Sequence, residues 1–190
     1  TPSLLWKVGC PNLGNDDGCT AGMSGIGQTW STPNVARVVV DGTVKPVIVV
    51  GGGYHNCEDG SATADCSAGK GSAIYVLDAA TGAVIRSFTT VGRVPSDVAV
   101  VDVDYDGLPD FAYVGDTRGN VYRVSFGRSK TAPLASAAWT STRVAYTTGA
   151  SRKFMYAPAL LPGFDRASGK YYIYLALGTG EVLPIELVPV

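Results

Sequence analysis

The stretch from residue 102 to residue 110 constrains this chain more than any other. It reads Asp-Val-Asp-Tyr-Asp-Gly-Leu-Pro-Asp, so four carboxylates occupy positions 1, 3, 5 and 9 of one short loop. Such acids repel one another unless a cation lies among them, and the glycine at position 6 permits the sharp turn that directs them inward. We therefore predict a Ca²⁺ site made of the carboxylates of Asp102, Asp104, Asp106 and Asp110 and the backbone carbonyl of Leu108.

Two other interpretations of this loop are weaker. A solvated Asp-Gly turn would account for Asp106 and Gly107 but not for the remaining acids. Mg²⁺ favours few protein ligands and keeps its waters, so a loop with five candidate donors suits it less well.

The residues on either side predict what kind of loop this is. Residues 97–101 and 111–114 are short apolar runs rich in Val and aromatic side chains, which are typical of strands. An EF-hand would need amphipathic helices at these places. We therefore expect a metal-binding hairpin between two β-strands.

Composition favours an all-β protein. The 190 residues include 24 Gly and 11 Pro, with few helix-like stretches. The net charge is −1 with no basic stripe, which disfavours nucleic-acid binding, and no apolar run is long enough for membrane insertion. The chain begins at Thr1 without a signal-peptide pattern, so we expect a processed product or a fragment.

Four cysteines form two pairs with the same spacing of nine residues, Cys10 with Cys19 and Cys57 with Cys66. Three connectivities are possible, and we favour Cys10–Cys19 and Cys57–Cys66, each closing its own polar loop. A zinc site is the alternative, but this spacing lacks the short knuckle of zinc modules. Disulfides indicate the periplasm, the outer cell surface or secretion.

The chain is periodic on a long scale. Prolines precede an apolar strand at separations of 62 and 63 residues (Pro33, Pro95 and Pro158). Glycines end a second strand at separations of 64 and 63 residues (Gly51, Gly115 and Gly178).

Third strands are expected at 73–77, 120–124 and 181–185, and fourth strands at 83–88 and 142–146. A recurring unit of four antiparallel strands is the mark of a β-propeller blade, and a β-sandwich is the alternative.

These repeats divide a single propeller segment, residues 1–190, into blades. The repeats cover about 29–91, 92–154 and 155–190, and residues 1–9 would hold the last strand of a preceding blade, Leu4 to Val8. About three blades do not close a ring. We therefore expect a partial set of blades whose partner is the remainder of a larger propeller.

Several stretches together resemble the C-terminal β-propeller of the PilY family, the large adhesin-like proteins of type IV pili. They come in the family's order and span most of the chain: 4–6, 27–33, 50–54, 74–82, 101–110 and 113–123. The Thr-Gly turn at 81–82 is shared with quinoprotein repeats, whereas the acidic loop followed by Tyr-Val-Gly-Asp and Gly-Asn-Val-Tyr-Arg is far more specific.

The resemblance implies a seven-bladed ring at or near a pilus tip, with Ca²⁺ in the acidic loop. It implies a role in pilus assembly, extension and retraction, twitching motility and adhesion, with pilus subunits or minor pilins as partners and a host surface or surface sugars as further candidates. Some family members carry an Arg-Gly-Asp integrin-binding tripeptide. This chain has Arg118-Gly119-Asn120 instead, so that activity is not expected.

Two other functions remain open. A quinoprotein-like dehydrogenase propeller also carries Thr-Gly turns and Ca²⁺, but no cofactor-clamping pair is recognisable, so we expect no enzyme activity. Another secreted ligand-binding propeller with an integrin-like calcium loop is the third possibility.

Other residues have simpler explanations. Gly51 to Gly53 should end a strand, because no helix or Lys follows as in a phosphate-binding loop. His55, the only histidine, should lie in a loop, and Asp16 and Asp17 should lie in a solvated turn. Turn hydrogen bonds are expected for Asp78 and Asp116, and burial between blades for Trp6, Trp30 and Trp139.

Overall fold

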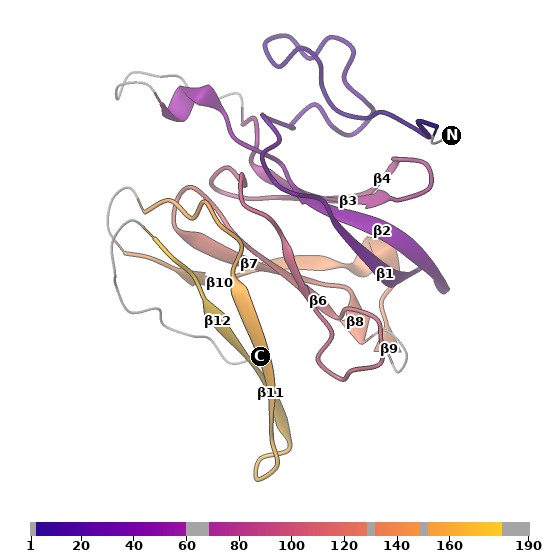
Figure 1. Ribbon diagram of the computed structural model, residues 1–190, viewed down its shortest axis with the longest axis vertical. Coiled ribbons are helices and arrows are strands. Elements are labelled where there is room, and N and C mark those ends of the chain that lie inside the picture. Colours follow the sequence, from indigo (N-terminus) through magenta and orange to yellow (C-terminus); the bar gives the residue numbers. More distant parts are fainter. Residues whose placement is uncertain (1–2, 60–68, 129–131, 149–151, 180–190) are drawn as a thin grey trace.

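The computed structural model describes residues 3–59, 69–128, 132–148 and 152–179, and it shows an all-β protein. Two four-stranded antiparallel sheets lie face to face, and a two-stranded hairpin packs beside the second sheet (Figure 1). Only two single-turn 3₁₀ helices interrupt the strands within these residues, η1 (Asn56–Glu58) and η2 (Ser136–Ala138). No helix in the described part of the chain is long and apolar enough to cross a membrane.

The first sheet is a complete blade with strand order β1-β2-β3-β4. Its strands are β1 (Asn34–Val40), β2 (Thr43–Gly51), β3 (Ala73–Asp78) and β4 (Val84–Thr89). Tight turns connect them where the sequence supplies Asp-Gly and Thr-Gly pairs. In the turn at 78–82, the Asp78 carboxylate accepts hydrogen bonds from the amides of Ala80 and Thr81, as predicted.

The second sheet repeats this arrangement with strand order β5-β6-β7-β10. Its strands are β5 (Ala99–Val101), β6 (Phe111–Gly115), β7 (Asn120–Ser125) and β10 (Thr140–Tyr146). A short pair, β8 (Gly127–Arg128) and β9 (Ala132–Pro133), lies between β7 and β10. The four-stranded repeat predicted from the spacing of prolines and glycines is therefore confirmed for two blades.

The third repeat begins with the hairpin of β11 (Ala159–Asp165) and β12 (Lys170–Ala176). Its predicted third strand at 181–185 lies outside the described residues. The number of blades in a closed ring stays a prediction.

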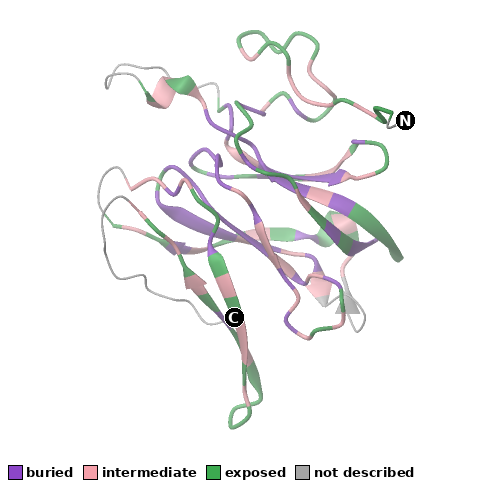
Figure 2. Cartoon of the chain, in the orientation of Figure 1, coloured by how far each residue is buried: buried purple, intermediate pink, exposed green. Residues whose placement is uncertain are grey.

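The core lies between the two sheets, and Figure 2 shows that much of their strands is buried. The side chains that meet there are mostly β-branched. The first sheet contributes Val38, Val49 and Val76, and the second contributes Val114 and Val124. A separate cluster joins the far side of the second sheet to the β11–β12 hairpin through Val101, Val103, Tyr113 and Ile173. Blades therefore stack in sequence order, as in a propeller.

The N-terminal segment corrects one prediction. Leu4 to Val8 form no strand, because no described backbone pairs with them. The segment is held instead by side chains. The Trp6 indole Nε1 donates to the Ala79 carbonyl at 3.0 Å, and its ring lies on Gly82 so closely that a Cβ there would approach the ring to 2.8 Å.

Residues 8–26 cover the outer face of the first sheet, where Met23 and Ile26 pack against Tyr75 and Leu77. The predicted Cys10–Cys19 disulfide is present in this segment. The second predicted pair involves Cys66, which lies outside the described residues.

The tryptophans have different environments. Trp139 is buried between the two sheets, and Trp6 is half-buried. Trp30 is 66% exposed, so its predicted burial is wrong. Its ring lies 5.9 Å from the ring of Tyr54 at the surface instead of packing between blades.

Strand connections gather at two opposite ends of the sheets. The acidic loop joins β5 to β6 at one end, together with the β1–β2 turn, which is tied by Asp41 to Ser136. The loop between β2 and β3, the β6–β7 turn and the segment near Lys153 meet at the other end. Each end therefore presents a separate surface built from several blades.

Candidate metal centre

The acidic loop leaves β5 at Val101 and returns at Phe111, so it connects two strands as predicted. Its base is closed by a backbone hydrogen bond of 2.9 Å from the Asp110 amide to the Val101 carbonyl. The tight path requires a left-handed backbone at Tyr105 (φ 58°) and at Gly107 (φ 92°). The buried side chains of Val103 and Leu108 anchor the loop, while the acids between them remain accessible.

Three carboxylates of this loop converge. One oxygen each from Asp102, Asp104 and Asp106 lies within 4.8 Å of the others. Two oxygens bound at about 2.4 Å on opposite sides of a Ca²⁺ ion are about 4.8 Å apart, so this spacing fits a shared calcium ion.

Asp110 lies at the base of the same loop and is fully buried (0% exposed). Its Oδ2 accepts a hydrogen bond of 2.8 Å from the Val103 amide, whereas its Oδ1 is buried without a hydrogen-bond partner. Burial raises the pKa of this carboxyl, and the charges of Asp104, Asp102 and Asp106 raise it further. A buried carboxylate oxygen without a partner beside three other acids is the environment in which a cation is most stabilising.

Backbone amides already orient the acids. The Gly107 amide donates to Asp102 at 2.7 Å, and the Leu108 amide donates to Asp106 at 2.9 Å. The Asp106 amide contacts both Asp102 and Asp104, at 3.2 and 3.3 Å. These bonds fix the side chains in the loop before any ion binds, which lowers the entropy lost on binding.

The donor set therefore fits a hard divalent cation, since every candidate ligand is oxygen. The structure brings together Asp102, Asp104 and Asp106, whereas Asp110 lies at the base of the same loop and outside that group. The individual ligand roles, including that of the Leu108 carbonyl, stay predictions.

The other sequence candidates have structural roles. Gly51 ends β2 so close to the next segment that a Cβ would lie 2.3 Å from the Val94 carbonyl oxygen. His55 caps η1, accepting from the Cys57 amide at 3.3 Å. Asp16 pairs with Lys70, and the two cysteines beside it are joined in a disulfide, which leaves no thiolate there to bind a metal.

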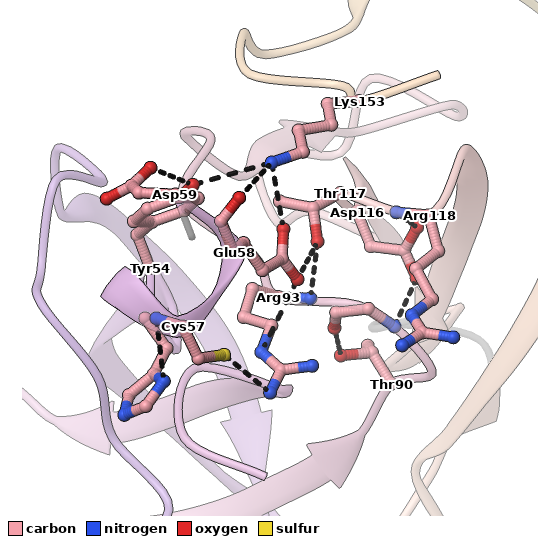
Figure 3. A network of polar contacts seen from close by, with 12 residues as sticks. Tyr54, Cys57, Glu58, Asp59, Thr90, Arg93, Asp116, Thr117, Arg118 and Lys153 are labelled. Carbon is pink, nitrogen blue, oxygen red and sulfur yellow. Dashed lines mark hydrogen bonds and ion pairs between the residues drawn. The ribbon is translucent and has the colours of Figure 1, made fainter. Parts of the chain in front are cut away.

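A polar network at the opposite end of the sheets was not predicted from the sequence (Figure 3). At its centre is Glu58, which is mostly buried. Its Oε1 accepts from the Thr117 hydroxyl at 2.9 Å and lies 3.5 Å from the Arg93 Nε, while its Oε2 lies 3.3 Å from the Lys153 Nζ. Partial burial lowers the pKa of Lys153, but hydrogen bonds with Tyr54 and Glu58 and the charge of Glu58 together raise it above its ordinary value.

Asp116 forms the second half of this network. Its carboxylate accepts from the amides of Gly92, Arg118 and Asn120 at 2.7–2.8 Å and from the Asn120 side chain. The predicted turn bonds of Asp116 are thus present, and the bond to Gly92 also ties the β6–β7 turn to the connection between the two blades.

The comparisons with known proteins agree with this architecture. Residues 1–181 match the family model for the PilY1 beta-propeller domain. The type IV pilus biogenesis factor PilY1 of Pseudomonas aeruginosa strain PAO1 is 29% identical over 125 residues, which is 63% of this chain. That of strain UCBPP-PA14 is 31% identical over 100 residues, or 53% of this chain. The chain spans only 9% and 8% of the lengths of these two relatives.

A solved structure gives the same result. The crystal structure of the Pseudomonas aeruginosa PilY1 C-terminal domain superposes with a TM-score of 0.59 and 25% identity, covering 83% of this chain and 33% of that one. With the stacked four-stranded blades and a family match over nearly its whole length, this chain belongs to the PilY1 β-propeller domain family.

Proposed function

We propose that this chain is a calcium-binding propeller segment of a protein of type IV pilus biogenesis. The observation that carries the proposal is the convergence of Asp102, Asp104 and Asp106 within 4.8 Å, in a loop whose base also holds the buried, partnerless Oδ1 of Asp110. The names of its relatives support the pilus role.

Binding would neutralise four closely spaced negative charges. Without neutralisation, the acids repel one another and the β5–β6 connection loosens; with it, the loop is held in one conformation. A partner that prefers the held conformation is then coupled to calcium by linkage. We propose that this coupling serves pilus extension and retraction, twitching motility and adhesion, at the periplasm or the outer cell surface.

Two partners follow from the same proposal. Pilus subunits or minor pilins would bind the assembled propeller. Further blades would pack on the outer face of the β11–β12 hairpin, where Leu161, Tyr172 and Tyr174 are exposed. An apolar sheet face of this kind is normally covered in a propeller. No catalytic step is part of the proposal.

The test is calcium titration by calorimetry of the chain and of the Asp104→Ala/Asp106→Ala variant. We expect the variant to lose binding, because two of the three converging carboxylates are gone. We also expect it to lose the stabilisation that calcium gives, about 2.7 kcal/mol at a hundredfold excess over Kd. The Asp17→Ala variant removes an exposed acid from another loop and should bind calcium unchanged. Equal calcium uptake by all three proteins would refute the site.

A second prediction separates the role of Asp110 from that of the other acids. In Asp110→Asn, the amide oxygen can keep the bond from Val103 while the NH₂ group replaces the partnerless oxygen. Without calcium, we expect this variant to gain about 1–2 kcal/mol in the free energy of unfolding, because a buried charge is removed. With saturating calcium, we expect it to be less stable than the unmodified chain, because a ligand is lost.

Urea unfolding in a chelator and in excess calcium measures both effects. Asp17→Asn, in an exposed turn, is the matched control. It should change the free energy of unfolding by the same amount with chelator and with calcium. The idea that calcium compensates the Asp110 charge would be wrong if the Asp110→Asn effect had the same sign in both conditions.

A further inference from the structure

A cleft of about 540 Å³ opens at the end of the sheets opposite the acidic loop. It lies over the ends of β3 and β4 and is closed on one side by the N-terminal segment and on the other by the β6–β7 turn. This volume is within the range of small-molecule sites. Its lining includes Tyr75, Ser87, Thr89, Val91, Arg93 and Arg118.

Charge in this cleft is positive. Arg93 and Arg118 both line it, and no acidic residue does so among those described. Figure 3 shows the two guanidinium groups on the same side of the network, away from Lys153. The charge of Arg93 is balanced by Glu58. The Arg118 side chain makes no ion pair with any described residue, so its charge is available to a ligand.

Hydrogen bonds fix the backbone segments that carry both arginines. The amides of Arg118 and Asn120 donate to Asp116 at 2.8 Å, which fixes the turn that carries Arg118. The amide of Arg93 donates to the Thr117 hydroxyl at 3.0 Å, so the two arginine-bearing segments are tied to each other. A site on such fixed backbone is preorganised.

Hydroxyl groups provide the rest of the lining. Tyr75 pairs with Ser87, and Ala73 with Thr89, across β3 and β4, so these side chains lie on one face of the sheet. The ring of Tyr75 is buried, yet its hydroxyl makes no hydrogen bond to any described residue. Val91, beside them, is an exposed apolar side chain. Hydroxyl donors and acceptors together with a small apolar surface match a sugar ring, and an unpaired guanidinium matches a carboxylate.

We propose that this cleft binds an acidic saccharide. The carboxylate of a uronic acid would pair with Arg118, and its hydroxyls would bond to Tyr75, Ser87 and Thr89. The ring would pack on Val91. This site shares no residue with the acidic loop, so it is independent of calcium binding.

The test is calorimetric titration of the chain with glucuronate, in calcium-free buffer because uronates themselves bind calcium. We expect a Kd in the millimolar range, as is usual for a single sugar on a small site, with glucose at least tenfold weaker. Arg118→Gln should weaken glucuronate binding at least tenfold, and Tyr75→Phe about threefold. Arg37→Gln, an exposed arginine on β1, should leave binding unchanged.

Three results would overturn the proposal. The first is a Kd for glucuronate weaker than about 10 mM. The second is equal weakening by Arg118→Gln and Arg37→Gln, which would indicate a diffuse charge effect. The third is sulfate competing as strongly as glucuronate, which would mean that an anion binds without recognition of the sugar hydroxyls. Circular dichroism of each variant verifies that its fold is retained.

Discussion

Trp139→Ala is expected to lower the free energy of unfolding by about 3–5 kcal/mol, the range for truncating a fully buried Trp. Trp139 is 1% exposed and follows η2, from which its ring reaches the interface between the two blades. Its ring meets that of Phe126 edge to face at 5.1 Å, and its Nε1 donates to the Leu134 carbonyl at 3.2 Å. The substitution therefore removes a large apolar contact, an aromatic pair and a hydrogen bond together.

Chemical denaturation monitored by far-UV circular dichroism measures this loss. Trp30→Ala is the matched control, because it removes the same side chain from a site where most of it is exposed. We expect that control to change the free energy of unfolding by less than about 0.5 kcal/mol. Equal losses in the two variants would mean that the blade interface is not where most of the stability resides.

These two tryptophans also show where prediction from the sequence reaches its limit. Both follow a small polar or apolar residue and precede a Thr or Ser, so their local patterns do not separate them. Burial of Trp139 is decided by a second sheet whose strands are distant in sequence, and no local pattern encodes that contact. The Leu4 to Val8 segment was misassigned for a related reason. Its apolar residues suit a strand, but no described backbone pairs with it.

The acidic loop, in contrast, was predictable because its geometry is local. All four acids lie within nine residues, and Gly107 determines the turn that brings them together. The hairpin context was equally local, since apolar runs adjoin the loop on both sides. The network around Glu58 could not be found in this way. Its members come from four separate loops, and the separation between Lys153 and Glu58 is 95 residues.

Glu58→Ala is expected to have the second largest effect. It should lower the free energy of unfolding by about 3–5 kcal/mol, the range for removing one partner of a buried ion pair. Arg93 has a side chain only 4% exposed, and the Glu58 carboxylate forms an ion pair with it. Without Glu58 the mostly buried guanidinium loses the carboxylate 3.5 Å from its Nε, the Lys153 ammonium loses its ion pair, and the Thr117 hydroxyl loses its acceptor.

Glu58 also joins three separate parts of the fold. It lies in η1, within the long connection of the first blade, whereas Thr117 belongs to the second blade and Lys153 to the segment that leads to the third.

Lys153→Met is the control, because Lys153 is about one-third exposed and its pair with Glu58 should contribute less than about 1 kcal/mol. If the burial of the Arg93 charge is the cause, the double variant Glu58→Ala/Arg93→Met should recover part of the stability that Glu58→Ala loses, since the buried guanidinium is then absent as well. If Glu58→Ala lowered the free energy of unfolding no more than Lys153→Met does, the Glu58 ion pairs would contribute no more than ordinary surface pairs. Glu58 would then not stabilise the junction of the blades.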